Sequence, residues 1–171
     1  MKHASRGVTL LELMIAITIL GILIGIAVPS FRAFTRNNRA TAAQNDLVTA
    51  LNVARSESMR RSRPVSLCPS TDGETCSADG NWAQGWMVFL DPTGAAGDLD
   101  GADDEPLESW PAIGGDLTLD ADRDFVQYQP IGVADAATEF DIAWPGCGNN
   151  QNRRINILVT GSISSLKNNC S

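Results

Sequence analysis

The chain has 171 residues, of which 43% are hydrophobic, and its 20 acidic residues outnumber its 13 basic ones. A chain of this length supplies one small domain, and we find no internal repeat in it. Its one histidine, His3, stands near the amino terminus, so the remainder cannot build a Ser/His/Asp or Cys/His site or a histidine metal cluster. We therefore expect no enzymatic activity, no catalytic residues, no metal site and no cofactor.

An apolar run extends from Val8 to Val28 and is interrupted by one carboxylate, Glu12. At about 1.5 Å of rise per residue this run spans roughly 30 Å, the thickness of a bilayer's hydrocarbon core. We predict that residues 8–28 are the transmembrane half of a helix. Two alternatives are a signal peptide cleaved near Gly25–Ala27 and a plain anchor whose glutamate reaches the interface.

Neither alternative explains the boundary where the short basic leader MKHASRG meets the apolar run. Cleavage there would create an α-amine at Val8, about 6 Å along the helix from Glu12. The carboxylate would then have a partner, in its own chain or in a neighbouring helix. The stretch Gly7-Val8-Thr9-Leu10-Leu11-Glu12 resembles the prepilin motif of type IV pilins and type II secretion pseudopilins.

That resemblance implies a leader at residues 1–7, which a prepilin peptidase removes after Gly7, and N-methylation of Val8, where the family usually has Phe. It also implies that Glu12 and Pro29 serve filament assembly, since such pilins commonly carry a proline at this place.

The periodicity continues beyond Pro29 and predicts that residues 29–62 are an amphipathic second half of the same helix, bent or loosened at the proline. Apolar residues recur here at spacings of three and four, which predicts one buried stripe and a helix running to about Met59. The stripe consists of Ala40, Ala43, Leu47, Leu51 and Ala54. We expect it to pack on a globular domain formed by residues 63–171.

Charge is segregated along the chain, with seven arginines and two acids in residues 30–63, but four basic residues and seventeen acids in residues 64–171. One interpretation is a solvated basic helix beside an acidic domain kept soluble by its charge. The other is that stacked subunits set basic helix surface against a neighbour's acidic surface.

The four cysteines, Cys68, Cys76, Cys147 and Cys170, form no CxxC pair. An even set in a small domain predicts disulfides and an oxidising compartment, although a reduced, buried set is the alternative. Three connectivities are possible, and we favour Cys68 with Cys76 and Cys147 with Cys170 because each closes a local loop. The cysteines thus place the domain on an oxidising side of the membrane, whereas the count of flanking positive charges would place it inside the cell.

The fold class that we expect is α+β, with one antiparallel sheet packed on the long helix. Alternating and β-branched residues predict strands at 64–68, 86–90, 125–129, 140–144, 154–159 and 163–166. The acidic segment 91–105 resembles a calcium loop only in part, because Ala102 occupies the fifth ligand position of an EF-hand that begins at Asp98. We expect a mobile acidic surface loop there.

Several short stretches resemble the GspH/FimT family of minor pilins and H-type pseudopilins. They are Ala54-Arg55-Ser56-Glu57, Pro64-Val65-Ser66-Leu67-Cys68, Thr71-Asp72-Gly73, and Gly85-Trp86-Met87-Val88-Phe89 with Asp91. The resemblance implies a type IV pilin-like fold and a low-abundance structural subunit that starts or tips a filament. It also implies an inner-membrane location with a periplasmic domain. The implied partners are other minor and major pilins or pseudopilins, the prepilin peptidase, the inner-membrane assembly platform and membrane lipid.

A pilus-associated DNA-uptake receptor is the alternative function, because some FimT-type minor pilins bind DNA through a carboxyl-terminal Gly-Arg-x-Arg motif. The corresponding stretch here, Gly161-Ser162-Ile163-Ser164, has neither arginine. Phosphate binding needs Lys or Arg, and the acidic domain offers only Arg123, Arg153, Arg154 and Lys167. We therefore expect little or no DNA binding.

Overall fold

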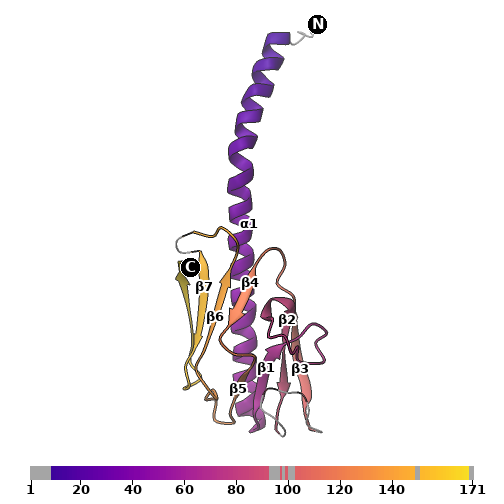
Figure 1. Ribbon diagram of the computed structural model, residues 1–171, viewed down its shortest axis with the longest axis vertical. Coiled ribbons are helices and arrows are strands. Elements are labelled where there is room, and N and C mark those ends of the chain that lie inside the picture. Colours follow the sequence, from indigo (N-terminus) through magenta and orange to yellow (C-terminus); the bar gives the residue numbers. More distant parts are fainter. Residues whose placement is uncertain (1–8, 93–96, 98, 100–102, 149–150, 170–171) are drawn as a thin grey trace, which may run out of the picture. The chain divides into compact units, whose positions relative to one another are not determined.

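The computed structural model describes residues 9–92, 97, 99, 103–148 and 151–169. The chain divides into two compact units, Met1–Thr35 and Arg36–Ser171. One helix, α1 (Leu10–Arg61), contributes its first half to one unit and its second half to the other (Figure 1). Each unit is described by itself.

The first unit is an apolar helix whose side chains are exposed. Its most apolar 18-residue window has a mean hydropathy of 2.6, and none of that window is buried inside the protein. By length and composition this helix is able to cross a membrane. The helix continues through Pro29, so the backbone donor that proline lacks does not end it.

Two threonine hydroxyls on this helix are satisfied within the helix itself. Thr18 donates to the Met14 carbonyl oxygen at 2.7 Å, and Thr35 donates to that of Phe31 at 2.9 Å. A polar group without a partner is costly in hydrocarbon, and bonding to the carbonyl four residues earlier removes that cost.

The second half of α1 buries one face against the rest of its unit. The buried residues are Ala40, Ala43, Leu47, Ala50, Leu51, Ala54 and Ser58, which confirms the predicted stripe. Most of them are small, so the sheets can approach the helix backbone closely. The helix ends at Arg61, and the next residue, Ser62, adopts a left-handed conformation with φ of 53°.

Two four-stranded antiparallel sheets, and not one, lie against this helix (Figure 1). The first has the order β3 (Glu105–Pro111), β2 (Gly85–Leu90), β1 (Val65–Pro69) and β5 (Val126–Tyr128). The second has the order β4 (Thr118–Ala121), β6 (Thr138–Ala143), β7 (Asn152–Ile157) and β8 (Ile163–Asn168). The expected single sheet is therefore wrong, because β5 is only three residues long and β6 pairs with β4 and β7 instead.

The larger hydrophobic core joins the helix to both sheets. Trp82, in the short 3-10 helix η1 (Trp82–Gln84), meets Phe140 of β6 edge to face, with ring centroids 4.9 Å apart. The Trp82 indole nitrogen donates to the Arg123 carbonyl oxygen at 3.1 Å. This aromatic pair therefore fastens the segment before β2 to the second sheet.

The outer face of the first sheet carries a smaller core of its own. Cys68, Met87 and Phe89 are buried there, and Cys76, Leu99 and Phe125 pack against them. A disulfide joins Cys68 to Cys76 across a Cα–Cα distance of 5.6 Å, which is one of the two pairs that the sequence favours. The strands β1 and β2 are consequently buried on both faces.

A buried carboxylate holds the start of the acidic segment. Asp91 accepts hydrogen bonds from the Gly97 amide at 2.9 Å and from the Gln127 side chain at 2.7 Å. Gly97 is buried and Leu99 is half-buried, whereas Asp103 and Glu105 are exposed. Most of the expected mobile acidic loop, residues 93–96, 98 and 100–102, lies outside the described residues, so that expectation stays a prediction.

Two further carboxylates accept local hydrogen bonds, Asp72 in the turn after β1 and Glu57 in the last turns of α1. Asp72 accepts from the amides of Glu74 and Thr75, each at 2.8 Å, and these bonds lower its pKa. Glu57 accepts from Arg60 and Arg61, and hydrogen bonds from their guanidinium groups lower the pKa of Glu57 to about 2.

Replacing Phe140 by alanine removes the partner of Trp82 and leaves a cavity between the sheets. We expect a loss of about 3–5 kcal/mol in the free energy of unfolding, measured by urea titration of the chain in mild detergent with tryptophan fluorescence. The control is Leu166→Ala, because Leu166 is exposed on β8, and it should change the value by less than about 0.5 kcal/mol. Equal effects of the two variants would contradict the role assigned to Phe140.

Acid should destabilise this unit through Asp72 and Glu57. Because their folded pKa values lie below the unfolded ones, their stabilisation is complete above about pH 6 and is lost as the pH falls through the unfolded values toward the folded ones. We expect the urea midpoint to fall on acidification and to fall less steeply in Asp72→Asn, which keeps an acceptor oxygen but no charge. Glu74→Gln, an exposed change in the same turn, is the matched control, and an unchanged slope in Asp72→Asn would refute the assignment.

Candidate assembly site

The amino-terminal end of α1 carries the glutamate that the sequence singles out. Thr9 precedes the first helical residue, and its hydroxyl oxygen accepts from the Glu12 amide at 3.3 Å. The Thr9 carbonyl oxygen accepts the first helical bond from the Leu13 amide at 3.1 Å. Thr9-Leu10-Leu11-Glu12 thus has the sequence and half of the hydrogen bonds of a capping box.

Glu12 therefore has a second role, in capping the helix, which sequence reasoning missed although the Thr-x-x-Glu pattern is present in the sequence. A carboxylate in the first turn also interacts favourably with the positive end of the helix dipole. The side chain is exposed, and it remains accessible to a further partner. Gly7 and Val8, the predicted cleavage and methylation residues, lie outside the described residues.

The helix carries a second pattern that sequence reasoning passed over, the pair Gly21 and Gly25. An added Cβ at either glycine would meet no atom of the chain within 4 Å. Internal packing therefore does not require these glycines. Glycines four residues apart allow close approach of a second helix in a membrane.

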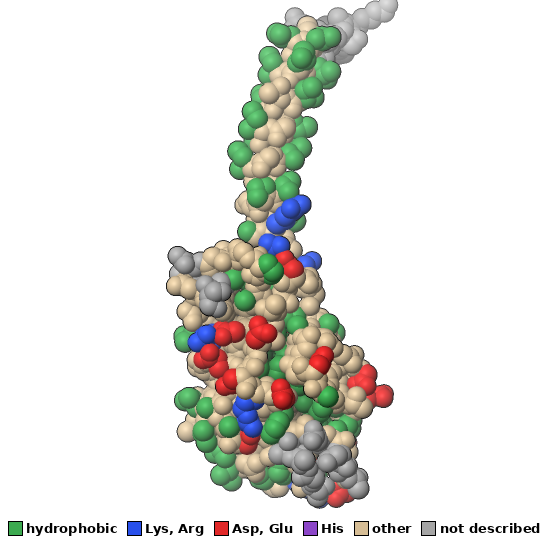
Figure 2. Space-filling model, viewed as in Figure 1, with side chains coloured by type: hydrophobic (Ala, Val, Ile, Leu, Met, Phe, Trp, Pro, Cys, Tyr) green, Lys and Arg blue, Asp and Glu red, His purple; other side chains and the backbone are tan. Residues whose placement is uncertain are grey.

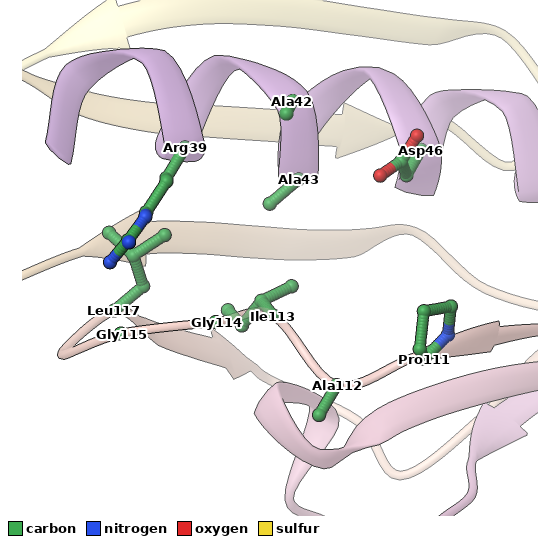
Figure 3. A pocket seen from close by; sticks show the side chains of 10 residues that line it. All are labelled: Arg39, Ala42, Ala43, Asp46, Pro111, Ala112, Ile113, Gly114, Gly115 and Leu117. Atoms are coloured by element: carbon green, nitrogen blue, oxygen red, sulfur yellow. The ribbon is translucent and has the colours of Figure 1, made fainter. Parts of the chain in front are cut away.

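An open groove of about 260 Å³ lies between α1 and the connection from β3 to β4 (Figure 3). Arg39 stands at one end, over the turn at Gly115, and Asp46 stands at the other. Between them the lining is mostly small and apolar, with Ala43 and Leu117 among its residues. The groove has no cluster of polar groups that would orient a small-molecule substrate.

Two of the basic residues considered for DNA binding, Arg153 and Arg154, are engaged within the domain instead. Arg153 is only 2% exposed and donates to the Asn37 side-chain oxygen at 2.5 Å and to the Gln151 carbonyl oxygen at 3.0 Å. Burial lowers its pKa. Arg154 binds the Asp141 carboxylate through two nitrogens, at 3.0 and 2.8 Å, and also contacts Glu139. Neither guanidinium is available to a phosphate.

The residues predicted for the second disulfide and for a calcium site lie only partly within the described residues. Cys147 is disulfide-bonded, whereas Cys170, its favoured partner, lies outside the described residues. Among the described residues, no group of three or more His, Cys, Asp or Glu side chains is placed to hold a metal ion. Asp98 and Asp100 of the calcium alternative are not among them.

An exposed apolar helix that has a Thr-x-x-Glu cap at its start and continues into an antiparallel domain is typical of the pilin class of membrane-anchored proteins. Residues 43–161 match the family described as Type II transport protein GspH, and residues 2–28 match the prokaryotic N-terminal methylation motif. The chain belongs to the GspH family.

Solved structures with the same fold come from both kinds of filament system. The type IV minor pilin FimU of Pseudomonas aeruginosa is 20% identical, with a TM-score of 0.58 over 77% of this chain and 90% of that one. The minor pseudopilin EpsH of the Vibrio cholerae type 2 secretion system is 13% identical, with a TM-score of 0.50 over 74% of this chain and 94% of that one. These likenesses show the fold.

A relative in sequence is the pilin-like protein PilA1 of Thermus thermophilus, which is 37% identical over 87 residues. The match covers 50% of this chain and 48% of that protein, about half the length of each.

Proposed function

We propose that this chain is a structural subunit of a type IV pilus or of a type II secretion pseudopilus. The observation that carries the proposal is the combination, in one chain, of an N-terminal methylation motif on a membrane-length helix and a GspH-family domain. A helix that is apolar on all sides needs lipid or other helices around it. A filament of parallel subunits supplies such neighbours, and a bilayer supplies the surroundings before assembly.

The subunit is made as a precursor in the inner membrane, and a prepilin peptidase removes residues 1–7 after Gly7 and methylates Val8. Residues 8–28 span the membrane, residues 29–62 form the amphipathic half of the helix, and residues 63–171 form a periplasmic domain. The Cys68–Cys76 disulfide supports the periplasmic side, since such bonds persist in oxidising compartments. This argument outweighs the positive charges that follow the span.

Glu12 pairs with the new amine at Val8 during docking, in the same chain or between two staggered chains. Its exposed side chain in the first helical turn supports this pairing, and a buried charge in apolar surroundings requires such a partner. Pro29 lies within the continuous helix and leaves one backbone carbonyl without its helical donor, so the helix can adjust there as subunits pack.

Within the filament the subunit is a minor one that helps to start or tip the assembly. Its partners are other minor and major pilins or pseudopilins and the inner-membrane assembly platform. The FimU and EpsH folds support a minor role in either system. DNA is not among the partners, because Arg153 and Arg154 are engaged within the domain.

Processing gives the first test. In assembled material we expect the chain to begin at Val8 and to carry one added methyl group, as read by mass spectrometry of the intact protein. Gly7→Val should leave the uncleaved precursor in the membrane, because the peptidase requires the small residue before the cut. The control, Gly21→Val, lies within the span and should be cleaved normally. Assembled protein that still begins at Met1 would sink the proposal.

The charge of Glu12 and its capping role can be separated by substitution. Glu12→Gln can still complete a capping box, since Gln serves at this position as well as Glu, but it has no charge to pair with the Val8 amine. We expect Glu12→Gln and Glu12→Ala to be processed normally and to enter the sheared filament fraction at roughly a tenth of the normal level, the effect of about 1.4 kcal/mol.

Normal incorporation of Glu12→Gln with poor incorporation of Glu12→Ala would show that capping matters and charge pairing does not. Thr9→Val, which removes the capping hydroxyl while keeping the charge, is the converse control.

A further inference from the structure

The disulfide between Cys68 and Cys76 closes a small ring around a turn centred on Asp72. Cys68 lies on β1, and Cys76 follows it at a sequence separation of 8. Two cysteines bond only when their Cα atoms come within about 7 Å, which a free loop achieves in a small part of its conformations. Contacts within the ring are therefore needed to bring these two cysteines together.

Hydrogen bonds to Asp72 fix the middle of the ring. Its Oδ1 accepts from the amides of Glu74 and Thr75, each at 2.8 Å, and its Oδ2 accepts from the Thr75 hydroxyl at 2.8 Å. Bonds to an ionised acceptor are about twice as strong as neutral ones. They turn the chain back at Asp72 and fix Thr75, the residue immediately before Cys76.

Ser70 ties the Asp72 turn to the strand that carries Cys68. Its side chain is buried; the hydroxyl donates to Asp72 Oδ1 at 3.1 Å and accepts from the Gly73 amide at 2.9 Å. The Ser70 amide donates to the Gly85 carbonyl oxygen of β2 at 2.9 Å. The turn is therefore anchored to the first sheet two residues beyond Cys68.

Two further contacts close the ring from outside the turn. The Ser77 amide donates to the Pro69 carbonyl oxygen at 2.7 Å, so the residues that directly follow the two cysteines are bonded to each other. Gly73 has φ of 73°, and a Cβ there would lie 2.8 Å from the Ser109 Oγ of β3, so glycine alone fits this conformation and this contact. None of these contacts involves a sulfur atom, and they hold the ring in shape without the disulfide.

The two cysteines differ in burial. Cys68 is 1% exposed and belongs to the smaller core with Met87 and Phe89, whereas Cys76 packs at the edge of that core and is partly exposed. Thiol–disulfide exchange requires that the incoming disulfide reach the attacking thiolate. Cys76 is therefore the thiol that an external oxidant meets first.

We propose that Asp72 is a positioning residue for the oxidation of Cys68 and Cys76, which its turn holds together in the folded domain before their bond forms. The Cys76 thiolate attacks a small-molecule disulfide such as oxidised glutathione, releases one small thiol and leaves a mixed disulfide. The Cys68 thiolate then attacks the Cys76 Sγ and releases the second small thiol. Two protein thiols lose two protons and two electrons in all, and the small disulfide gains them.

Positioning of this kind selects one pairing among the cysteines. A turn that raises the effective concentration of Cys76 at Cys68 favours this pair over a bond from either cysteine to Cys147. The bond then fixes Cys76 against the smaller core. The inference concerns the covalent maturation of the domain, and it does not depend on the proposed role in a filament.

Equilibration of the full chain with reduced and oxidised glutathione, in mild detergent, measures the effective concentration of Cys76 at Cys68. No Lys or Arg lies between Arg63 and Arg123, so trypsin leaves both cysteines in one fragment, apart from Cys147. Mass spectrometry of that fragment after alkylation reports this pair alone.

We expect Asp72→Ala to lower the effective concentration roughly tenfold, and Asp72→Asn, which keeps the Oδ1 acceptor, to lower it less. Glu74→Gln is the matched control and should leave the value unchanged, because Glu74 joins the turn through its amide. A merely structural Asp72 would lower the urea midpoints of the reduced and oxidised chains alike and leave the effective concentration unchanged, which would overturn the proposal. Loss of native tryptophan fluorescence when the wild-type chain is reduced would overturn it as well, because the turn would then need the disulfide.

Single-cysteine variants test the order of the two steps. With oxidised glutathione, Cys68→Ser should trap the mixed disulfide on Cys76, whereas Cys76→Ser should react at the buried Cys68 roughly tenfold more slowly. Mass spectrometry of the tryptic fragment over time gives both rates. Equal rates, or faster reaction at Cys68, would refute the assignment of Cys76 as the thiol that reacts first.

Discussion

The buried stripe on the second half of α1 is the constraint on which the globular unit depends. Each of the two sheets places one face on it, so the helix contributes to a core that neither sheet could close alone. Small residues make this possible, because Ala40, Ala43, Ala50 and Ala54 allow two layers of strands to approach one helix. Leu47 and Leu51 fill the space between them. A larger residue at one of the alanines would push a sheet away and open the core at Trp82 and Phe140.

The helix and the buried strands were predictable because each has one dominant signal. The stripe has a 3.6-residue period, and residues 86–90 form a short apolar run that is buried on both faces as β2. The two strands that sequence reasoning missed, β3 and β4, are edge strands. Their sequences, EPLESWP and TLDA, contain proline or acidic residues that are typical of loops. Pairing with a neighbour, which the local sequence does not encode, makes them strands.

The division into two sheets could not be predicted either, since it depends on which strands pair across long separations in the sequence.

The ion pairs between the helix and the rest of its unit could not be predicted for the same reason. The sequence separates a basic helix from an acidic domain, but Arg36 binds Asp116 and Arg61 binds Glu105. Arg55 binds two backbone carbonyls. Two arginines of the helix are therefore paired with acids of the same chain, while residues 64–171 keep their large excess of acidic residues, so both interpretations of the segregated charge stay predictions.

The charged side chains that remain exposed bear on assembly. Arg32 is exposed on the first unit, and Asp120 and Asp122 are exposed on the second. Figure 2 shows acidic side chains on the visible face of the second unit. Exposed charges at such positions mainly set orientation and exclude wrong partners. Affinity has to come from apolar surface, which the described domain offers at exposed side chains such as Ile131 and Leu158 and the first unit offers along its helix. A subunit built in this way can discriminate between neighbours by charge while it is held in the filament by hydrophobic contact, and the two properties can change independently in evolution.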